Sequence, residues 1–170
     1  MGKKSIKEDK NIYFESREEA GLTRAQASEI IGTISESRLE KLETGKTSLY
    51  PEDVVDMARA YKKPGLCNYY CTHECRIGKE SVPEVKASSL SEIVLGMLSA
   101  LNSLDNHKAR LIDITADGVI SDDELSDFVE IQRQLDQINL TVESLKLWVA
   151  STIAEGKINK EKIEELKKRL

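Results

Sequence analysis

Residues 21–45, GLTRAQASEIIGTISESRLEKLETG, carry the signals of two short helices joined by a tight turn. Thr23 stands where an N-cap belongs, and Gln26 three residues later can complete a capping box. Apolar residues follow at helical spacing until Gly32, which can adopt the positive φ that ends a helix. The sequence therefore predicts a first helix of about two turns between Thr23 and Gly32.

The second half of this stretch predicts a helix with one apolar side. Ser35 is its candidate N-cap, Leu39 and Leu42 lie three residues apart, and Gly45 ends the segment. The polar residues left for the outer faces are Glu36, Ser37, Arg38, Glu40 and Lys41. A short helix with an apolar back and a polar front is what reading of the DNA major groove requires.

GLTRAQASEIIG followed by ISESRLEKLETGK resembles the helix-turn-helix of the Cro/cI phage-repressor-like family of bacterial regulators, also called the xenobiotic-response-element family. The resemblance covers residues 11–70 and is most specific at Gly32 and at the two ends of residues 21–45. It implies an all-α protein whose N-terminal domain, residues 11–77, has five helices and binds DNA. The residues that it assigns to DNA contact are Arg24, Glu36, Ser37, Lys41 and Lys46, and Arg38 on the outer face of the second helix is a further candidate.

Two features depart from the pattern of this family. The turn Thr33-Ile34 is one residue longer than usual, a length that can rotate or shift the second helix. Ser28 stands where the family usually has Ala at the helix crossing, and it is small enough to permit close approach.

Charge is balanced in this region. Residues 1–63 contain 12 Lys or Arg and 12 Asp or Glu, whereas a DNA-binding domain usually has a basic excess because phosphate contacts release counterions. On the second helix Glu36, Glu40 and Glu43 would repel phosphates unless one accepts a hydrogen bond from a cytosine amino group. We therefore expect a single copy to bind DNA weakly.

The composition is that of an all-α protein, with 39% hydrophobic and only 5% aromatic residues in 170. No stretch approaches the ~20 apolar residues of a membrane span, and MGKKSIKEDK lacks the apolar region of a signal peptide. Three cysteines, an odd number, argue against a secreted disulfide framework. We expect a cytoplasmic protein with no membrane partner.

Residues 1–10 contain Lys3, Lys4, Lys7 and Lys10 and almost no apolar side chain. They are expected to form a flexible basic N-terminus. The alternative is an arm that reaches the DNA backbone or minor groove.

The segment LCNYYCTHEC, residues 66–75, holds all three cysteines at steps of four. Cys67, Cys71, His73 and Cys75 could complete a zinc site or hold part of an iron–sulfur cluster. In the alternative interpretation the segment is the last helix of the N-terminal domain, and its cysteines pack as small hydrophobic residues. A helix spreads these positions too far apart for one ion, so a metal site would require the helix to end near Cys71.

Residues 78–88 are polar and contain Gly78 and Pro83, so they are expected to be a linker. Two long amphipathic helices with near-heptad spacing are expected after it. The apolar positions are Leu90, Val94, Met97, Leu101, Leu104 and Leu111 in the first, and Leu125, Phe128, Ile131, Leu135, Ile138, Val142, Leu145 and Val149 in the second. They predict an antiparallel helical hairpin.

A lone hairpin cannot cover apolar stripes this wide. Either a short terminal helix over residues 160–170 folds back on it, or two chains pair through residues 89–170 into a homodimer. The turn over residues 113–124 matches a calcium loop at six positions but has Thr115 where a carboxylate is expected. Helix capping by Gly118, Ser121 and Glu124 explains the same residues, so calcium is not expected.

The leading interpretation is a sequence-specific DNA-binding transcriptional regulator that acts as a dimer. One alternative is a protein-interaction adaptor whose repressor-like fold no longer binds DNA, and another is a metal or thiol sensor that uses the cysteine segment. An enzyme is not expected, because the sequence has neither a glycine-rich phosphate loop nor a nucleophile elbow.

Overall fold

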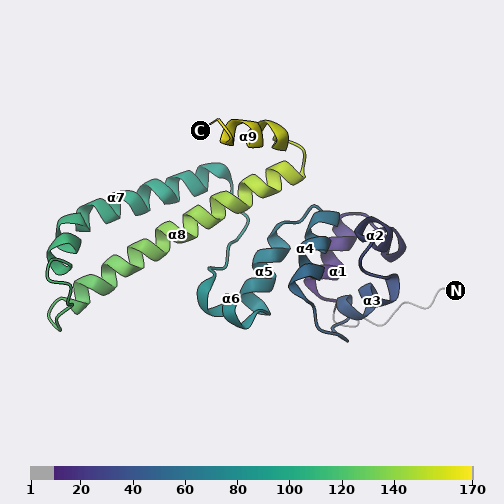
Figure 1. Cartoon of the computed structure of the whole chain (residues 1–170), viewed down its shortest axis with the longest axis horizontal. Coiled ribbons are helices and arrows are strands. Elements are labelled where there is room, and N and C mark those ends of the chain that lie inside the picture. The colour runs from purple at the N-terminus through teal and green to yellow at the C-terminus, as the bar shows by residue number, and fades with distance from the viewer. Residues whose placement is uncertain (1–9, 170) are drawn as a thin grey trace. The chain divides into compact units, whose positions relative to one another are not determined.

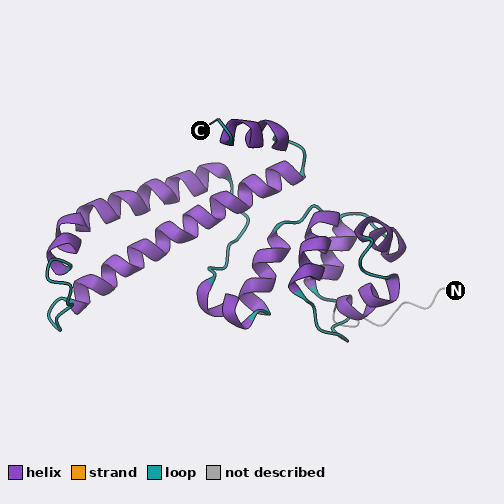
Figure 2. Ribbon diagram, viewed as in Figure 1, coloured by secondary structure: helices purple, strands orange, loops and turns teal. Residues whose placement is uncertain are grey.

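The computed structural model describes residues 10–169, which contain nine α-helices and no strand (Figures 1 and 2). The all-α prediction is confirmed. The helices are α1 (Ile12–Glu19), α2 (Arg24–Ile31), α3 (Glu36–Glu43), α4 (Pro51–Ala60), α5 (Gly65–His73), α6 (Arg76–Ser81), α7 (Leu90–Ile114), α8 (Leu125–Ala154) and α9 (Lys160–Lys167). Most of the basic N-terminus predicted over residues 1–10 lies outside the described residues.

Two compact units divide the chain. Residues 10–82 and 150–169 form one unit, and residues 83–149 form the other. The helix-turn-helix segment and the cysteine segment belong to the first unit, and most of the hairpin belongs to the second.

The first helices begin and end where the local sequence predicts. Asn11 caps α1 by accepting a hydrogen bond from the backbone N–H of Phe14. Thr23 and Gln26 form the expected capping box of α2, which ends at Gly32 with a φ of 72°. Ser35 caps α3. Local backbone chemistry therefore sets the lengths of these helices.

The apolar sides of these helices meet in one core. Its buried members are Tyr13, Ala27, Ile34, Leu39, Leu42, Val54, Met57, Ala58, Tyr61 and Leu66. The N-terminal half of α5 seals this core, and Cys67, Tyr69 and Tyr70 pack at its edge. Five helices thus complete the N-terminal domain, as predicted.

A sixth helix, α6, follows this domain, where the sequence predicts the start of a linker. Gly78 looks like a helix breaker, yet it lies inside α6 and is buried. A Cβ built on Gly78 would lie 2.2 Å from the carbonyl oxygen of Cys71. Gly78 is therefore required for the close approach of α6 to α5, and the extended segment begins only after Ser81.

Helices α7 and α8 form the predicted antiparallel pair. Ser89 and Glu92 form a capping box at the start of α7. The methyl group of Thr141 on α8 would lie 3.4 Å from a Cβ built on Gly96 of α7. An ion pair of 2.6 Å between Arg110 and Asp127 joins the two helices near the turn.

The turn between these helices is built by capping interactions. Gly118 has a φ of 75°. A side-chain oxygen of Asp117 accepts a hydrogen bond from the backbone N–H of Val119 at 3.0 Å. The hydroxyl of Ser121 donates to the carboxylate of Glu124 at 2.6 Å. These contacts give the residues of the calcium-loop match a structural role.

None of the helices over residues 10–169 is long and apolar enough to span a membrane.

The contact between α5 and α6 at Gly78 can be tested by mutation, because packing overlap and helix propensity predict opposite changes in the free energy of unfolding. Gly78→Ala should lower the free energy of unfolding by about 1–3 kcal/mol, because the added methyl group overlaps backbone of α5. Helix propensity alone would raise stability by about 1 kcal/mol. Urea unfolding measures the difference, with Ser81→Ala on the exposed end of α6 as the control. A Gly78→Ala protein as stable as the unmodified protein would contradict the packing.

Candidate nucleic-acid interface

A buried ionic cluster fixes α3 against α1 and α2. Nε of Arg17 lies 2.5 Å from Oε1 of Glu43, and its Nη2 lies 3.1 Å from Oε2. Nε of Arg24 donates to Oε2 of Glu43 at 2.8 Å. Glu43 is fully buried, and Arg17 is 3% exposed. One carboxylate from the end of α3 therefore binds a cation from each of the two preceding helices.

The hydrogen bonds of the cluster favour the charged state of Arg17. Burial lowers the pKa of Arg17, but hydrogen bonds to Glu43 and Glu18 outweigh this effect and raise it. Arg17 also donates to the carbonyl oxygen of Leu22 at 2.5 Å, which ties the entry of α2 to the same group. Burial, followed by repulsion from Glu43, raises the pKa of the nearby Tyr61 hydroxyl. Arg17 therefore stays charged inside the domain.

The turn between α2 and α3 is held at both ends. The hydroxyl of Ser28 donates to the carbonyl oxygen of Ile34 at 2.8 Å. The hydroxyl of Thr33 donates to Asp56 of α4 at 2.7 Å. Ser28 therefore does more than permit a close helix crossing, because its hydroxyl satisfies a carbonyl of the lengthened turn. Buried Ile34 anchors the same turn in the core.

Arg38 is turned toward α4. It donates to Asp53 at 2.6 Å, and its guanidinium lies 5.5 Å from the centre of the Tyr50 ring. Asp53 also accepts from the backbone N–H of Tyr50 at 3.0 Å, which caps α4. The Arg38 side chain remains 36% exposed, so it borders the front of α3 while bracing that helix against α4.

The exposed front of α3 consists of four side chains. They are Glu36, Ser37, Glu40 and Lys41. The expectation that Glu43 would repel phosphates is wrong, because this carboxylate is buried and binds two arginines. Two carboxylates and one ammonium group remain on this front.

The other residues expected at DNA lie at the two ends of the α2–α3 pair. Arg24, at the start of α2, is 32% exposed and shares one donor with Glu43. Lys46 is exposed in the loop after α3. It borders an open hollow of about 400 Å³ that is also lined by Asn11, Leu42, Gly45, Thr47, Ser48, Leu49 and Glu74. The structure thus places Arg24, Ser37, Lys41 and Lys46 on exposed or half-exposed positions of the helix-turn-helix.

The cysteine segment is divided between two helices. Cys67 and Cys71 lie on α5, which ends at His73, whereas Cys75 is the N-cap of α6 and accepts from Gly78 at 3.5 Å. The ring of His73 stacks on Tyr69, with 4.2 Å between ring centres. Burial, and then the neighbouring Cys71, raises the pKa of the Cys67 thiol. Cys67 therefore favours its neutral form.

Among residues 10–169, no three His, Cys, Asp or Glu side chains are arranged to hold a metal ion. The metal site at Cys67, Cys71, His73 and Cys75 stays a prediction. It requires zinc or iron to co-purify with protein prepared without oxygen. Absence of both metals, together with DNA binding that is unchanged by oxidation, would contradict it.

Arg17 and the inward role of Glu43 are not among the features predicted from the sequence, which places Glu43 on the outer surface of its helix. A signal for both is present in the sequence. Arg17 follows Tyr13 by four residues, and Glu43 follows Leu39 by four, so each charge occupies an inward position of its helix. Opposite charges at inward positions of neighbouring helices indicate a buried ion pair.

Removal of the carboxylate that Arg17 and Arg24 share should lower the stability of the domain strongly. Glu43→Gln should lower the free energy of unfolding by about 3–5 kcal/mol, because it leaves the buried Arg17 with the exposed carboxylate of Glu18 as its only anionic partner. Glu40→Gln, on the exposed front of the same helix, should change it by less than about 0.5 kcal/mol. Chemical denaturation measures both. Equal effects of the two variants would refute the proposed role of the cluster.

Comparison with known proteins agrees with this geometry. Residues 15–65 match the family model described as a helix-turn-helix domain. The searches of curated proteins and of solved structures returned no match to the chain. The match begins inside α1, runs through α4 and contains the buried cluster, the turn and the front of α3. Residues 15–65 therefore form a helix-turn-helix domain of the Cro/cI-like, xenobiotic-response-element type.

Proposed function

We propose that the protein is a sequence-specific transcriptional regulator that binds double-stranded DNA as a homodimer. The helix-turn-helix domain itself indicates DNA binding. The observation that supports sequence reading is the rigid attachment of α3, whose inner residues Leu39, Leu42 and Glu43 are fully buried while its front remains exposed. Such a helix can enter a major groove without rearrangement.

Each exposed side chain has a role that follows from its chemistry. Lys41 and Lys46 are cations suited to phosphate oxygens, and Lys41 also lies on the base-facing front. Ser37 can donate to or accept from a base edge, and Glu36 can accept from a cytosine amino group. Arg24 and Arg38 retain donors beyond those that bind Glu43 and Asp53, so both can contact the backbone beside the groove.

The charge of the domain supports the dimer in this proposal. Glu36 and Glu40 oppose phosphate binding on the same front that carries Lys41. One domain should then bind weakly and with a small salt dependence. Two domains joined in one molecule gain affinity by avidity without any new contact, which is the role that we assign to residues 89–170.

A second function is favoured by the same two glutamates. A helix-turn-helix domain with Glu36 and Glu40 on its exposed front and no net charge over residues 1–63 could dock a basic partner protein instead of DNA. This adaptor function predicts duplex binding with a salt slope near zero.

Two lysine variants distinguish these functions. Lys46→Ala should weaken binding to all duplexes and lower the salt slope by about 1, because it removes one phosphate contact. Lys41→Ala should also change the preferred base. Lys79→Ala on α6 is the control and should leave affinity and slope unchanged. Fluorescence anisotropy at several salt concentrations measures all three, and equal affinity of the Lys46, Lys41 and control variants would support the adaptor.

A further inference from the structure

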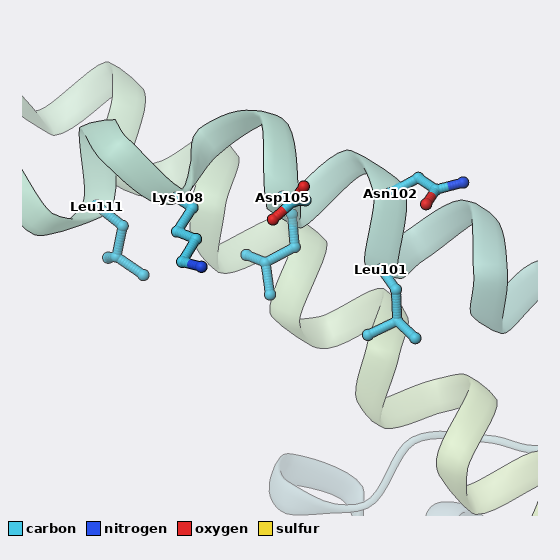
Figure 3. Close-up of a pocket in the computed structure, with 6 residues that line it drawn as sticks. Leu101, Asn102, Asp105, Lys108 and Leu111 are labelled. Carbon is cyan, nitrogen blue, oxygen red and sulfur yellow. The ribbon is translucent and has the colours of Figure 1, made fainter.

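Helix α7 carries an exposed row of side chains at alternating steps of four and three residues. The α7 seam, as we name it, consists of Val94, Leu98, Leu101, Asp105, Lys108 and Ile112. Its apolar members keep between 42% and 61% of their surface exposed. Figure 3 shows Leu101 and Lys108 directed to the same side of α7. This spacing is the heptad pattern of a helix that pairs with another helix.

The seam is distinct from the side of α7 that is already packed. Ile93 and Ala100 are buried, and Met97, Leu104 and Leu111 are half-buried. Between these two sides lies an open groove of about 510 Å³ that is lined by Leu101, Asn102, Leu104, Asp105, Lys108 and Leu111 (Figure 3). Within the unit formed by residues 83–149, Leu98 and Ile112 stay 53% and 61% exposed.

We propose that the α7 seam pairs in antiparallel orientation with the same seam of a second copy, about a two-fold axis between Asn106 and His107. Asp105 of one protomer then faces the partner's Lys108, and the symmetry repeats this pair. Leu101 faces the partner's Ile112. The proposal rests on the homodimer of the proposed function and specifies its face, orientation and register.

The two charges select this arrangement. In a parallel, in-register pair each Asp105 would face Asp105 and each Lys108 would face Lys108, and like charges at an interface cost several kcal/mol. Sliding the antiparallel pair by one heptad, so that Leu101 faces the partner's Asp105, places both charges against leucines. Only the register with the axis between Asn106 and His107 pairs both charges and leaves Leu101 and Ile112 in apolar contact.

Asp105 and Lys108 are available to bind a partner. Among residues 10–169, the structure shows no ion pair or hydrogen bond made by the side chain of Asp105 or Lys108, although both are exposed on a helix with several apolar neighbours. Like the buried polar positions of coiled coils, they would contribute more to register than to affinity. The affinity would come from burial of Leu101 and Ile112, together with Leu98, which faces the partner's Thr115 at the C-cap of α7.

Charge reversal tests the pairing in the full-length protein. Asp105→Lys and Lys108→Asp should each raise the dimer dissociation constant at least about tenfold, because each creates two like-charge contacts. The double variant with both substitutions should return it to within about threefold. Asp136→Lys, on the exposed surface of α8, is the control and should leave it unchanged. Sedimentation equilibrium measures the dissociation constants.

Distance measurement tests the orientation. Ser91 and Ala109 are both exposed on α7 and lie 18 residues apart, which is five full turns, so they share one face. Spin labels at Ser91→Cys should be separated by about 46 Å along the helix axis in the antiparallel dimer, and labels at Ala109→Cys by only about 8 Å along that axis. The three native cysteines are replaced by alanine, and circular dichroism confirms the fold before labelling.

The outcomes separate this inference from the proposed function. Three results would overturn the antiparallel seam. They are equal distances at the two labels, a monomer at all concentrations, and a dimer whose dissociation constant neither charge reversal changes. If the protein binds duplex DNA as a dimer whose dissociation constant the charge reversals do not change, the seam is wrong but the DNA-binding function stands. A dimer that responds as expected but retains no duplex would uphold the seam and contradict the DNA-binding function.

Discussion

The ionic cluster of Arg17, Glu43 and Arg24 is the constraint on which the N-terminal domain depends. Each of the first three helices has only 8 residues, too few for stability in isolation. Their apolar sides bury a common core, but apolar contact alone tolerates small rotations. Glu43 removes that freedom, because its two oxygens must reach a cation on α1 and a cation on α2 at once. The front of α3 is therefore presented at one angle.

The same cluster alters the electrostatics of the surface. Glu43 belongs to a helix with three glutamates, and its burial leaves two of them beside Lys41 on the front. Asp53 and Asp56 of α4 are likewise engaged by Arg38 and by Thr33. Counting charges along the chain thus overstates the repulsion that a phosphate would meet at α3. Even so, a single domain with this charge is expected to bind DNA weakly. Pairing through residues 89–170, as proposed, would raise the affinity.

Features with local causes could be predicted from the sequence. The caps at Thr23 and Ser35, the end of α2 at Gly32 and the long hairpin all follow from side chains within a few residues. Features that depend on distant partners could not. Glu43 meets Arg17 across 26 residues, Arg38 meets Asp53 across 15, and Gly78 is explained only by the backbone of Cys71. Exposure of the outer α3 residues agrees with the candidate site, while their contacts to DNA stay predictions.

In the proposed dimer, two rigid α3 helices read DNA together. Selection of a random duplex library on the purified protein, at two salt concentrations, measures whether they do. A dimeric reader should enrich an inverted repeat whose half-sites lie about one helical turn apart, with weaker retention at the higher salt. Absence of any enriched sequence, with weak retention that salt does not change, would contradict it.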